Sequence, residues 1–428
     1  MTTTELLHLL TEGDAGYDEA RTVWNAMVDR RPAAIARCPD TAEVAAAVRY
    51  ARDHDLEIAV RCGGHNIAGL AVPEGGLMID LTPMSEVRVD PERRIAWIQG
   101  GALLGELDRA AQEYGLATTA GNVSHTGVGG LTLGGGMGWL ARQFGLACDN
   151  VLSYQLVTAD GDIVTASATE NPELFWGLRG GGGNFGIVTA FEFRLHQVGT
   201  RTLVAEFTYP ADEGFAVLRG WRDLNATAPR QATFTASVRG EELTVGFVWV
   251  GDPTEGAELI PAFRSLGTVV AESIEEMSYL TLQSRDDSVQ GHRFRRYWKG
   301  HYFKSLPDDA IRALLRNPGI GASLQAYGGA ISEVPDEDAA FSHRDTLFEF
   351  VTATRWEDPA DDAERIATIR AYAATLDQYA GGAYVNTLNG ESVSRAFPPA
   401  KLARLTALKN TYDPANVFHL NQNIRPTV

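Results

Sequence analysis

The sequence predicts an α+β fold with two lobes and a C-terminal segment. Over residues 1–197, helical periodicity is mixed with short strands, and the glycine clusters lie there. From residue 198 those clusters stop. Strands of alternating polarity, separated by helices, then predict an antiparallel sheet covered by helices. A chain of 428 residues also exceeds what one hydrophobic core supports. We therefore divide the chain at 1–197, 198–380 and 381–428.

The first lobe begins with an amphipathic helix at 41–53, with Thr41 near its start. The next part combines strands, two strand pairs and two further helical stretches. Strands are expected at 56–60, 75–82 and 186–195, strand pairs at 87–101 and 151–167, and helical stretches at 102–115 and 171–180.

The second lobe is expected to be a sheet with helices on it. Strands of alternating polarity lie at 232–240, 243–251 and 346–356, and a helix at 361–380 follows them. From Gly381 the chain is polar and loop-like, except for one amphipathic helix at 398–412.

The net charge excludes two classes of partner. The chain has 55 acidic and 37 basic residues, a net charge of -18, which argues against nucleic acid and anionic membrane surfaces. No apolar run is long enough to span a bilayer, and no secretory signal is visible. Cys38, Cys62 and Cys148 are widely spaced, which indicates neither a disulfide framework nor a metal site. We expect a cytoplasmic protein without a metal.

Glycine is unevenly distributed. Eight of the eighteen residues from Gly121 to Gly138 are glycine, as are five of the seven from Gly180 to Gly186. Residues 181–186, "GGGNFG", satisfy G-x-G-x-x-G, but a helical turn precedes them and a strand follows, the reverse of the Rossmann order. The stretches at 61–66 and 121–130 can instead form anion-binding nests of backbone N–H groups, or simply tight turns.

Four segments resemble one flavoprotein family. They are "RCGGHN", "GLTLGGGMGWLARQFGLACDNV", "FWGLRGGGGNFGIVT" and the tail "YDPANVFHLNQNI". In this order they resemble the berberine-bridge-enzyme-like branch of the vanillyl-alcohol-oxidase family, over nearly the whole chain. The resemblance implies a PCMH-type, two-part FAD-binding domain over 1–197 and a substrate domain over 198–380. It also implies that 381–428 returns to the FAD-binding domain.

The resemblance implies a covalent flavin. In that family the histidine of the "GGH" loop carries the 8α carbon of FAD, and here that histidine is His65. Many members have a second link through a cysteine, but Val123 stands at that position, so we expect a single link. Cys62 is interpreted as a small packing residue. The residues expected to bind FAD are Arg61, Cys62, Gly63, Gly64, His65, Asn66, Gly121, Ser124, Thr126, Gly127, Gly129, Gly130, Gly186, Val188, Asn386 and Asn421.

The catalytic base is open at this stage. The family transfers hydride to flavin N5 while a side chain takes a proton. Its Y-x-N-Y motif is matched by Tyr384 and Asn386, but Thr387 replaces the second tyrosine. Glu349, on a strand face with Leu347 and Val351, is a candidate because apolar neighbours raise a carboxyl pKa; the alternative is a structural glutamate. The other candidates are Tyr302, Tyr327, and Tyr384 with its pKa lowered by Lys299. His125 and His301 are also candidates, but no sequence pattern supports them.

The resemblance implies an FAD-dependent oxidoreductase that acts on an alcohol or amine carbon of a small organic substrate. A small side chain at Thr126 near the C4a–N5 edge would favour reoxidation by dioxygen. The alternatives are a flavin dehydrogenase or tailoring enzyme with low dioxygen reactivity, and a flavin-binding protein without turnover. The sequence leaves the substrate and the oligomeric state open.

Overall fold

A four-stranded sheet lies at the N-terminal end of the chain in the computed structural model, which describes residues 7–240, 242–287 and 292–427. Its strand order is β1-β2-β4-β3, with β1 antiparallel to β2 and the other neighbours parallel. Helix α2 (Thr41–Asp53) buries its alanine- and valine-rich face against this sheet, and Asp40 caps its first turn. The strands are β1 (Leu9–Leu10), β2 (Ala34–Arg37), β3 (Ile58–Arg61) and β4 (Leu77–Asp80).

A five-stranded antiparallel sheet forms the second part of the first lobe. Its order is β5-β6-β10-β8-β9, so the two hairpins flank the central strand β10. The strands are β5 (Val87–Asp90), β6 (Ile95–Gln99), β8 (Val151–Val157), β9 (Ile163–Ser167) and β10 (Ile187–Arg194), and a separate short pair joins β7 (Leu116–Ala117) to β11 (His196–Gln197).

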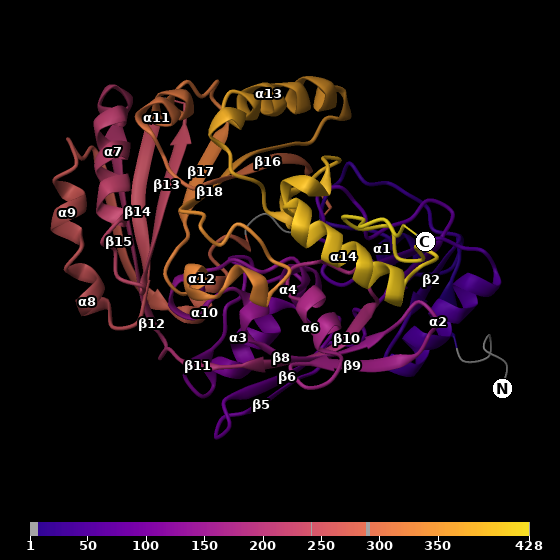
Figure 1. The fold of residues 1–428 in the computed structure, drawn as a ribbon. Helices are drawn as coiled ribbons and strands as arrows, with labels where there is room; N and C mark the ends of the chain where they lie inside the picture. The colour runs from indigo at the N-terminus through magenta and orange to yellow at the C-terminus, as the bar shows by residue number, and fades with distance from the viewer. Residues whose placement is uncertain (1–6, 241, 288–291, 428) are drawn as a thin grey trace.

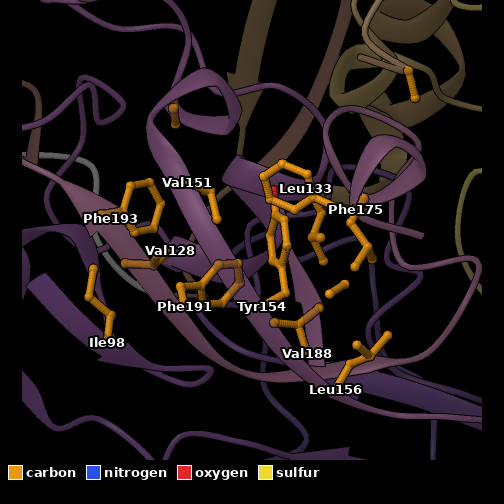
Figure 2. Close-up of a cluster of buried hydrophobic side chains, with 14 of the residues drawn as sticks. Ile98, Val128, Leu133, Val151, Tyr154, Leu156, Phe175, Val188, Phe191 and Phe193 are labelled. Atoms are coloured by element: carbon orange, nitrogen blue, oxygen red, sulfur yellow. The ribbon is translucent and has the colours of Figure 1, made fainter. Parts of the chain in front are cut away.

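The core beside this sheet fixes the long glycine-rich segment. Helix α4 (Val128–Leu133) inserts Val128 and Leu133 among Phe191, Phe193 and Tyr154 of the sheet, as Figure 2 shows. Apolar burial therefore anchors the segment immediately after the 121–127 loop.

The second lobe is built on a seven-stranded antiparallel sheet of order β15-β12-β14-β13-β17-β18-β16. Helices α7 (Gly214–Asn225), α11 (Asp308–Leu315) and α13 (Asp362–Ala374) cover one face (Figure 1) and share a core with its aromatic side chains. The strands are β12 (Arg201–Pro210), β13 (Ala232–Arg239), β14 (Glu242–Val250), β15 (Ala271–Ser278), β16 (Arg295–Phe303), β17 (Gly321–Ala326) and β18 (Phe348–Trp356).

The C-terminal segment packs on elements of the first 197 residues. Helix α14 (Pro399–Tyr412), yellow in Figure 1, lies beside α6 (Pro172–Leu178), and Leu405 and Leu408 join the core of the five-stranded sheet. The other helices are α1 (Tyr17–Ala20), α3 (Leu104–Gln112), α5 (Ala141–Phe144), α8 (Pro253–Ala257), α9 (Ile260–Arg264), α10 (Tyr279–Gln283) and α12 (Ala330–Glu333).

The α+β class and the antiparallel, helix-covered sheet are confirmed, whereas the boundaries at 197/198 and 380/381 remain predictions. Both predicted strand pairs and the helix at 41–53 are present. Within the described ranges, no helix combines the length and the apolar composition needed to cross a membrane.

Candidate active site

Two glycine loops meet at the end of β3. A Cβ atom added to Gly63 would lie 2.3 Å from the backbone N of Gly127, and one added to Gly127 would lie 2.4 Å from Cys62 Sγ. Gly64 has a φ of +68°, in the left-handed region that favours glycine. Glycine is therefore needed next to His65 because the two loops pack directly against each other. Cys62 packs closely against Gly127, and burial raises the pKa of its thiol to about 11.

His65 is held between a second histidine and a tryptophan. Its Nε2 lies 2.7 Å from Nδ1 of His125, and its Nδ1 lies 3.4 Å from the Thr126 hydroxyl. The Trp24 ring stacks on the imidazole with a centroid distance of 4.7 Å and an interplanar angle of 14°. Burial lowers the pKa of His65 to about 3, so the ring is neutral at pH 7.

The 121–130 loop is also held from the second lobe. Asp287 accepts hydrogen bonds from the Ser124 backbone N–H, at 2.9 Å, and from its hydroxyl. Asn122 donates to Gln325 Oε1 on β17 at 3.3 Å. The loop thus lies where the two lobes touch.

Other residues expected to bind FAD differ in what they contact. Gly129 and Val188 both approach Gly100, so they lie near the loops. Asn421 donates to the carbonyls of Gly183 and Phe418. Three further residues have packing or turn roles in this structure: Gly121 packs on Leu131, Gly186 on the Val157 carbonyl, and Asn66 caps a turn at Leu70 N.

The residues present fit a flavin dinucleotide. A Cβ added to Gly130 or Gly183 would meet nothing within 4 Å, so both backbones have an open side. Among the described residues, Arg61 Nε, Asn122 Oδ1 and Asn421 Oδ1 are buried without a hydrogen-bond partner. Backbone that can approach a phosphate, together with unused donors and acceptors, is what an elongated polar cofactor requires.

A buried carboxyl group lies among phenols on the seven-stranded sheet. Glu349 pairs in register with Gln325 on β17 and with Tyr302 on β16, so the three side chains share one face. The Tyr327 hydroxyl donates to Glu349 Oε2 at 2.7 Å and lies 3.4 Å from the Tyr302 hydroxyl. Phe348 and Phe350 point to the opposite face, under the helices.

Burial sets the proton affinities in this cluster. It raises the pKa of Glu349 to about 7, although the hydrogen bond from Tyr327 acts in the opposite direction. It also raises the pKa of Tyr302 and of Tyr327 well above the usual value of a phenol. Near neutral pH only the carboxyl group of this set can exchange a proton readily.

Tyr384 and Asn386 connect the phenols to the glycine-rich segment. The Tyr384 hydroxyl accepts from the Gly136 backbone N–H at 3.0 Å and from Asn386 Nδ2 at 2.9 Å. Asn386 Nδ2 also lies 3.3 Å from the carbonyls of Gly130 and Leu131.

The alternative in which Lys299 lowers the pKa of Tyr384 is wrong. Burial raises the pKa of Tyr384, and Lys299 forms an ion pair with Glu391 instead. Thr387, which stands in place of the second tyrosine, donates to the Tyr384 carbonyl at 2.8 Å, and a threonine hydroxyl is not a useful base near neutral pH.

The sequence interpretation missed three residues around this site: Trp24 on His65, Gln325 beside Glu349, and Asp287 on Ser124. Each reaches its partner from a distant part of the chain. Only Gln325 has a sequence feature that could have indicated it, because it lies on a strand that alternates in polarity. The register of that strand, which sets its neighbours, is a property of the folded sheet.

Comparisons with known proteins identify two segments. Residues 32–167 match the protein family described as "FAD binding domain", and residues 383–425 match "Berberine and berberine like". The chain is 32% identical to (R)-6-hydroxynicotine oxidase of Paenarthrobacter nicotinovorans, over 96% of this chain and 95% of the relative. It is 30% identical to an FAD-linked oxidoreductase of Bacillus subtilis, over 98% and 96%.

The fold is similar to a solved oxidase. The structure of glucooligosaccharide oxidase from Acremonium strictum, which has a 6-S-cysteinyl, 8α-N1-histidyl FAD, aligns with a TM-score of 0.90 and 26% identity. The alignment covers 99% of this chain and 98% of that one.

Proposed function

This chain belongs to the berberine-bridge-enzyme-like family of FAD-linked oxidoreductases. We therefore propose that it oxidises an alcohol or amine carbon of a small organic molecule. FAD, when bound, supplies the acceptor for the hydride. The observation that carries the proposal is the Glu349 carboxyl group, buried and held by Tyr327 on the sheet face shared with Tyr302.

Glu349 is the proposed general base. With its pKa near 7, the carboxylate form is available at neutral pH to take the O–H or N–H proton as the adjacent carbon is oxidised. Tyr327 orients the carboxyl group by donating to Oε2. Tyr302 and Tyr384 keep their protons and can donate hydrogen bonds to a polar substrate group.

We propose that the cofactor lies against the two glycine loops and the tail. The residues proposed to hold it are Arg61, Gly63, Gly64, Asn66, Ser124, Gly127, Gly129, Gly130, Asn386 and Asn421. We also propose that His65 carries a single covalent link, because Val123 stands in place of a cysteine. The histidyl link of the glucooligosaccharide oxidase supports this proposal. A cytoplasmic location is also proposed, supported by the free thiols of Cys38, Cys62 and Cys148.

Dioxygen is the proposed electron acceptor, supported by the oxidases among the relatives. A dehydrogenase is the second candidate, because one observation removes the sequence argument for dioxygen access. Thr126 lies against His65, which would place it at the benzenoid edge of the flavin rather than beside C4a and N5. Its small side chain therefore gives no support for dioxygen access.

The test is an anaerobic screen of alcohols, sugars and cyclic amines for loss of the flavin absorbance. We expect one class to bleach the flavin and admission of air to restore the colour within seconds. Bleaching without recovery in air would support the dehydrogenase. A flavin that only dithionite reduces would refute the enzymatic proposal.

A further inference from the structure

We propose that Arg142 is a positioning residue for the carboxyl group of Glu349: its buried guanidinium holds the backbone of Tyr327 and thereby keeps the Tyr327 phenol on that carboxyl. The relevance of this contact to the reaction rests on the role of base proposed for Glu349. The inference adds a residue of α5, in the glycine-rich segment, to a cluster that is built on the seven-stranded sheet.

Arg142 is a buried cation that forms no ion pair with a carboxylate within the described part of the chain. Its Nη1 donates to the Tyr327 carbonyl, and its Nη2 lies 3.3 Å from the Ala228 carbonyl. The charged group that faces it is Arg230, which pairs with Glu333. Burial lowers the pKa of the Arg142 guanidinium, so its carbonyl contacts are what offset the loss of water. The Tyr327 carbonyl is therefore bound by a charge-assisted donor.

The turn that follows β17 packs directly on the backbone of Arg142. Gly328 and Gly329 have φ angles of +83° and +56°, in the left-handed region that favours glycine. A Cβ atom added to Gly329 would lie 2.4 Å from the Arg142 carbonyl oxygen. The Tyr327 N–H donates to the Leu347 carbonyl at 2.8 Å. The backbone of Tyr327 is thus held at its N–H by the chain before β18 and at its carbonyl by Arg142.

A fixed backbone at Tyr327 fixes its hydroxyl, because the ring is buried among apolar neighbours and has few rotamers open to it. The hydroxyl donates to Glu349 Oε2 at 2.7 Å. Tyr302 and Tyr384 face Glu349 from β16 and from the C-terminal segment, and both keep their protons near neutral pH. Burial and the Tyr327 hydroxyl are the causes that set the pKa of Glu349, so Arg142 acts through Tyr327 and not by its own charge.

The hydrogen bond from Tyr327 stabilises the ionised form of Glu349. It lowers the pKa of that carboxyl group, whereas burial raises it to about 7. When the guanidinium of Arg142 is removed, the phenol loses its alignment and the pKa of Glu349 should rise further. Less of the carboxyl group is then ionised at pH 6, while nearly all of it is ionised at pH 9. A loss of packing alone would act equally at both pH values.

Four variants separate positioning from packing. Arg142→Met removes the guanidinium and keeps a long, flexible side chain, Arg142→Lys keeps a cationic donor, and Tyr327→Phe removes only the hydroxyl. Arg49→Met is the matched control, because Arg49 on α2 donates to the Gly161 carbonyl between β8 and β9. Infrared spectra of each holoenzyme from pH 5 to pH 9 follow the protonated-carboxyl band that Glu349→Gln lacks. Stopped-flow absorbance follows anaerobic flavin reduction by the compound that bleaches the flavin fastest in the screen.

We expect the infrared midpoint to rise by about one pH unit in Arg142→Met and in Tyr327→Phe, the scale of one hydrogen bond to a charged group. Flavin reduction in Arg142→Met should then be roughly tenfold slower than in wild type at pH 6 and close to wild type at pH 9. Combining Arg142→Met with Tyr327→Phe should move the midpoint no further, because both act on one hydrogen bond. Arg142→Lys should lie between Arg142→Met and wild type, and Arg49→Met should match wild type.

The outcomes that overturn the proposal differ from those that overturn the proposed function. A wild-type infrared midpoint in Arg142→Met, or equal slowing at every pH, refutes the role of Arg142. Shifts that add in the double variant refute the route through Tyr327. Should Arg142→Met fail to fold, Arg142→Gln, which is neutral and shorter, gives the same comparison. A wild-type rate that does not rise through pH 7 refutes Glu349 as the base, whereas the infrared midpoints still decide whether Arg142 positions Tyr327.

Discussion

At the scale of single residues, the most specific prediction about catalysis concerns Glu349. We expect Glu349→Gln to slow anaerobic flavin reduction by ~10²–10⁴-fold, and by more than Tyr302→Phe does, because only the carboxyl group has a pKa suited to the task. The base acts when ionised, so the wild-type rate should rise with pH through about 7. The Gln variant should lose that rise. Stopped-flow absorbance across pH measures both effects.

Glu276 is the control for a general loss of negative charge. It is an exposed glutamate on β15 that pairs with Arg201, and Glu276→Gln should reduce its flavin at the wild-type rate. A Glu349→Gln enzyme that is reduced at the wild-type rate at every pH would contradict the assignment. One of the phenols would then have to take the proton despite its raised pKa.

His65→Ala tests what the link does for the flavin. The protein should fold, because the contact between Gly63 and Gly127 and the core around α4 do not involve the imidazole. We expect flavin that acid releases, a lower reduction potential and slower turnover, since an electron-withdrawing substituent at the 8α carbon makes the ring a stronger oxidant. Redox titration against a reference dye measures the potential. An unchanged potential would show that the link serves only retention.

At the residue scale, the alternation of side chains along a strand predicts the face of a residue but not its partners on other strands. Alternation along the strand predicted the face of Glu349, and the raised pKa has the expected sign and cause. Of the two predicted neighbours, Val351 lies on the same strand, whereas Leu347 precedes the strand and is exposed. The group that bonds the carboxyl is Tyr327, beyond the end of β17. Cross-strand partners depend on register, which the sequence of one strand does not contain.

At the scale of elements, the contact of α3 with α10 contains a second buried carboxyl. Asp108 accepts a hydrogen bond from Gln283 Nε2 at 3.0 Å, and burial raises its pKa to about 7. Asp108 Oδ1 and Gln283 Oε1 have no partner among the described residues. A protonated Asp108 can donate from Oδ1 to Gln283 Oε1, which would complete an acid–amide pair between the helices.

This contact should make stability depend on pH. A folded pKa raised above the unfolded value of about 3.8 adds stability below that value, and this stability is lost as pH rises through about 7. Asp108→Asn keeps the shape and has an N–H for Gln283 Oε1. We expect the variant to lose less stability than wild type between pH 5 and pH 8, by on the order of 3 kcal/mol. Urea unfolding at the two pH values measures the difference.

A second titrating group and a control variant are needed to interpret that measurement. Glu349 also has a raised pKa, so some pH dependence should remain in the Asp108→Asn variant. Asp53→Asn, at the exposed end of α2, should follow the wild-type curve. Parallel curves for Asp108→Asn and wild type would mean that Asp108 is ionised in the folded protein.

Elements with a strong local signal could be predicted, and elements defined by pairing could not. Helix α2 begins and ends where its periodicity and cap indicate, and the hairpins β5–β6 and β8–β9 follow their turn residues. Strands β12, β15, β16 and β17 were missed. Strand β15 is mostly exposed and rich in glutamate, so its apolar alternation is weak, and it forms as the edge partner of β12.

At the scale of the whole molecule, the site exists only where distant segments meet. Asn25 pairs with the backbone of Arg296, Asn122 with Gln325, and Ser124 with Asp287. Each pair joins the first lobe to the second across 163 to 271 positions of sequence. The family resemblance supplies a prediction of which residues bind the cofactor, but no local pattern predicts these cross-lobe contacts.

The return of the chain to the first lobe is fixed by one buried ion pair. Lys409 on α14 donates to Asp413 Oδ2 at 2.6 Å and to the carbonyls of Asn184 and Phe418 at 2.9 Å, and both charged side chains are fully buried. Asp413 also accepts from the backbone N–H groups of Val417 and Phe418. The pair thereby joins α14, the tail and the glycine-rich segment around Asn184.

Removing one charge from this pair should therefore destabilise the whole molecule. Asp413→Asn leaves the Lys409 ammonium buried without a counter-charge, and we expect a loss of about 3–5 kcal/mol in the free energy of unfolding. Glu173→Gln is the control on the same helix contact, because Glu173 pairs with Arg404 at the surface and should contribute ~1 kcal/mol or less. Lys409→Met combined with Asp413→Asn should recover part of the loss, since no charge then stays buried. Urea unfolding followed by circular dichroism and by flavin fluorescence compares the three. Equal losses of unfolding free energy in Asp413→Asn and Glu173→Gln would contradict this expectation. They would show that the buried ion pair adds no more than the exposed one and that apolar contacts hold the tail.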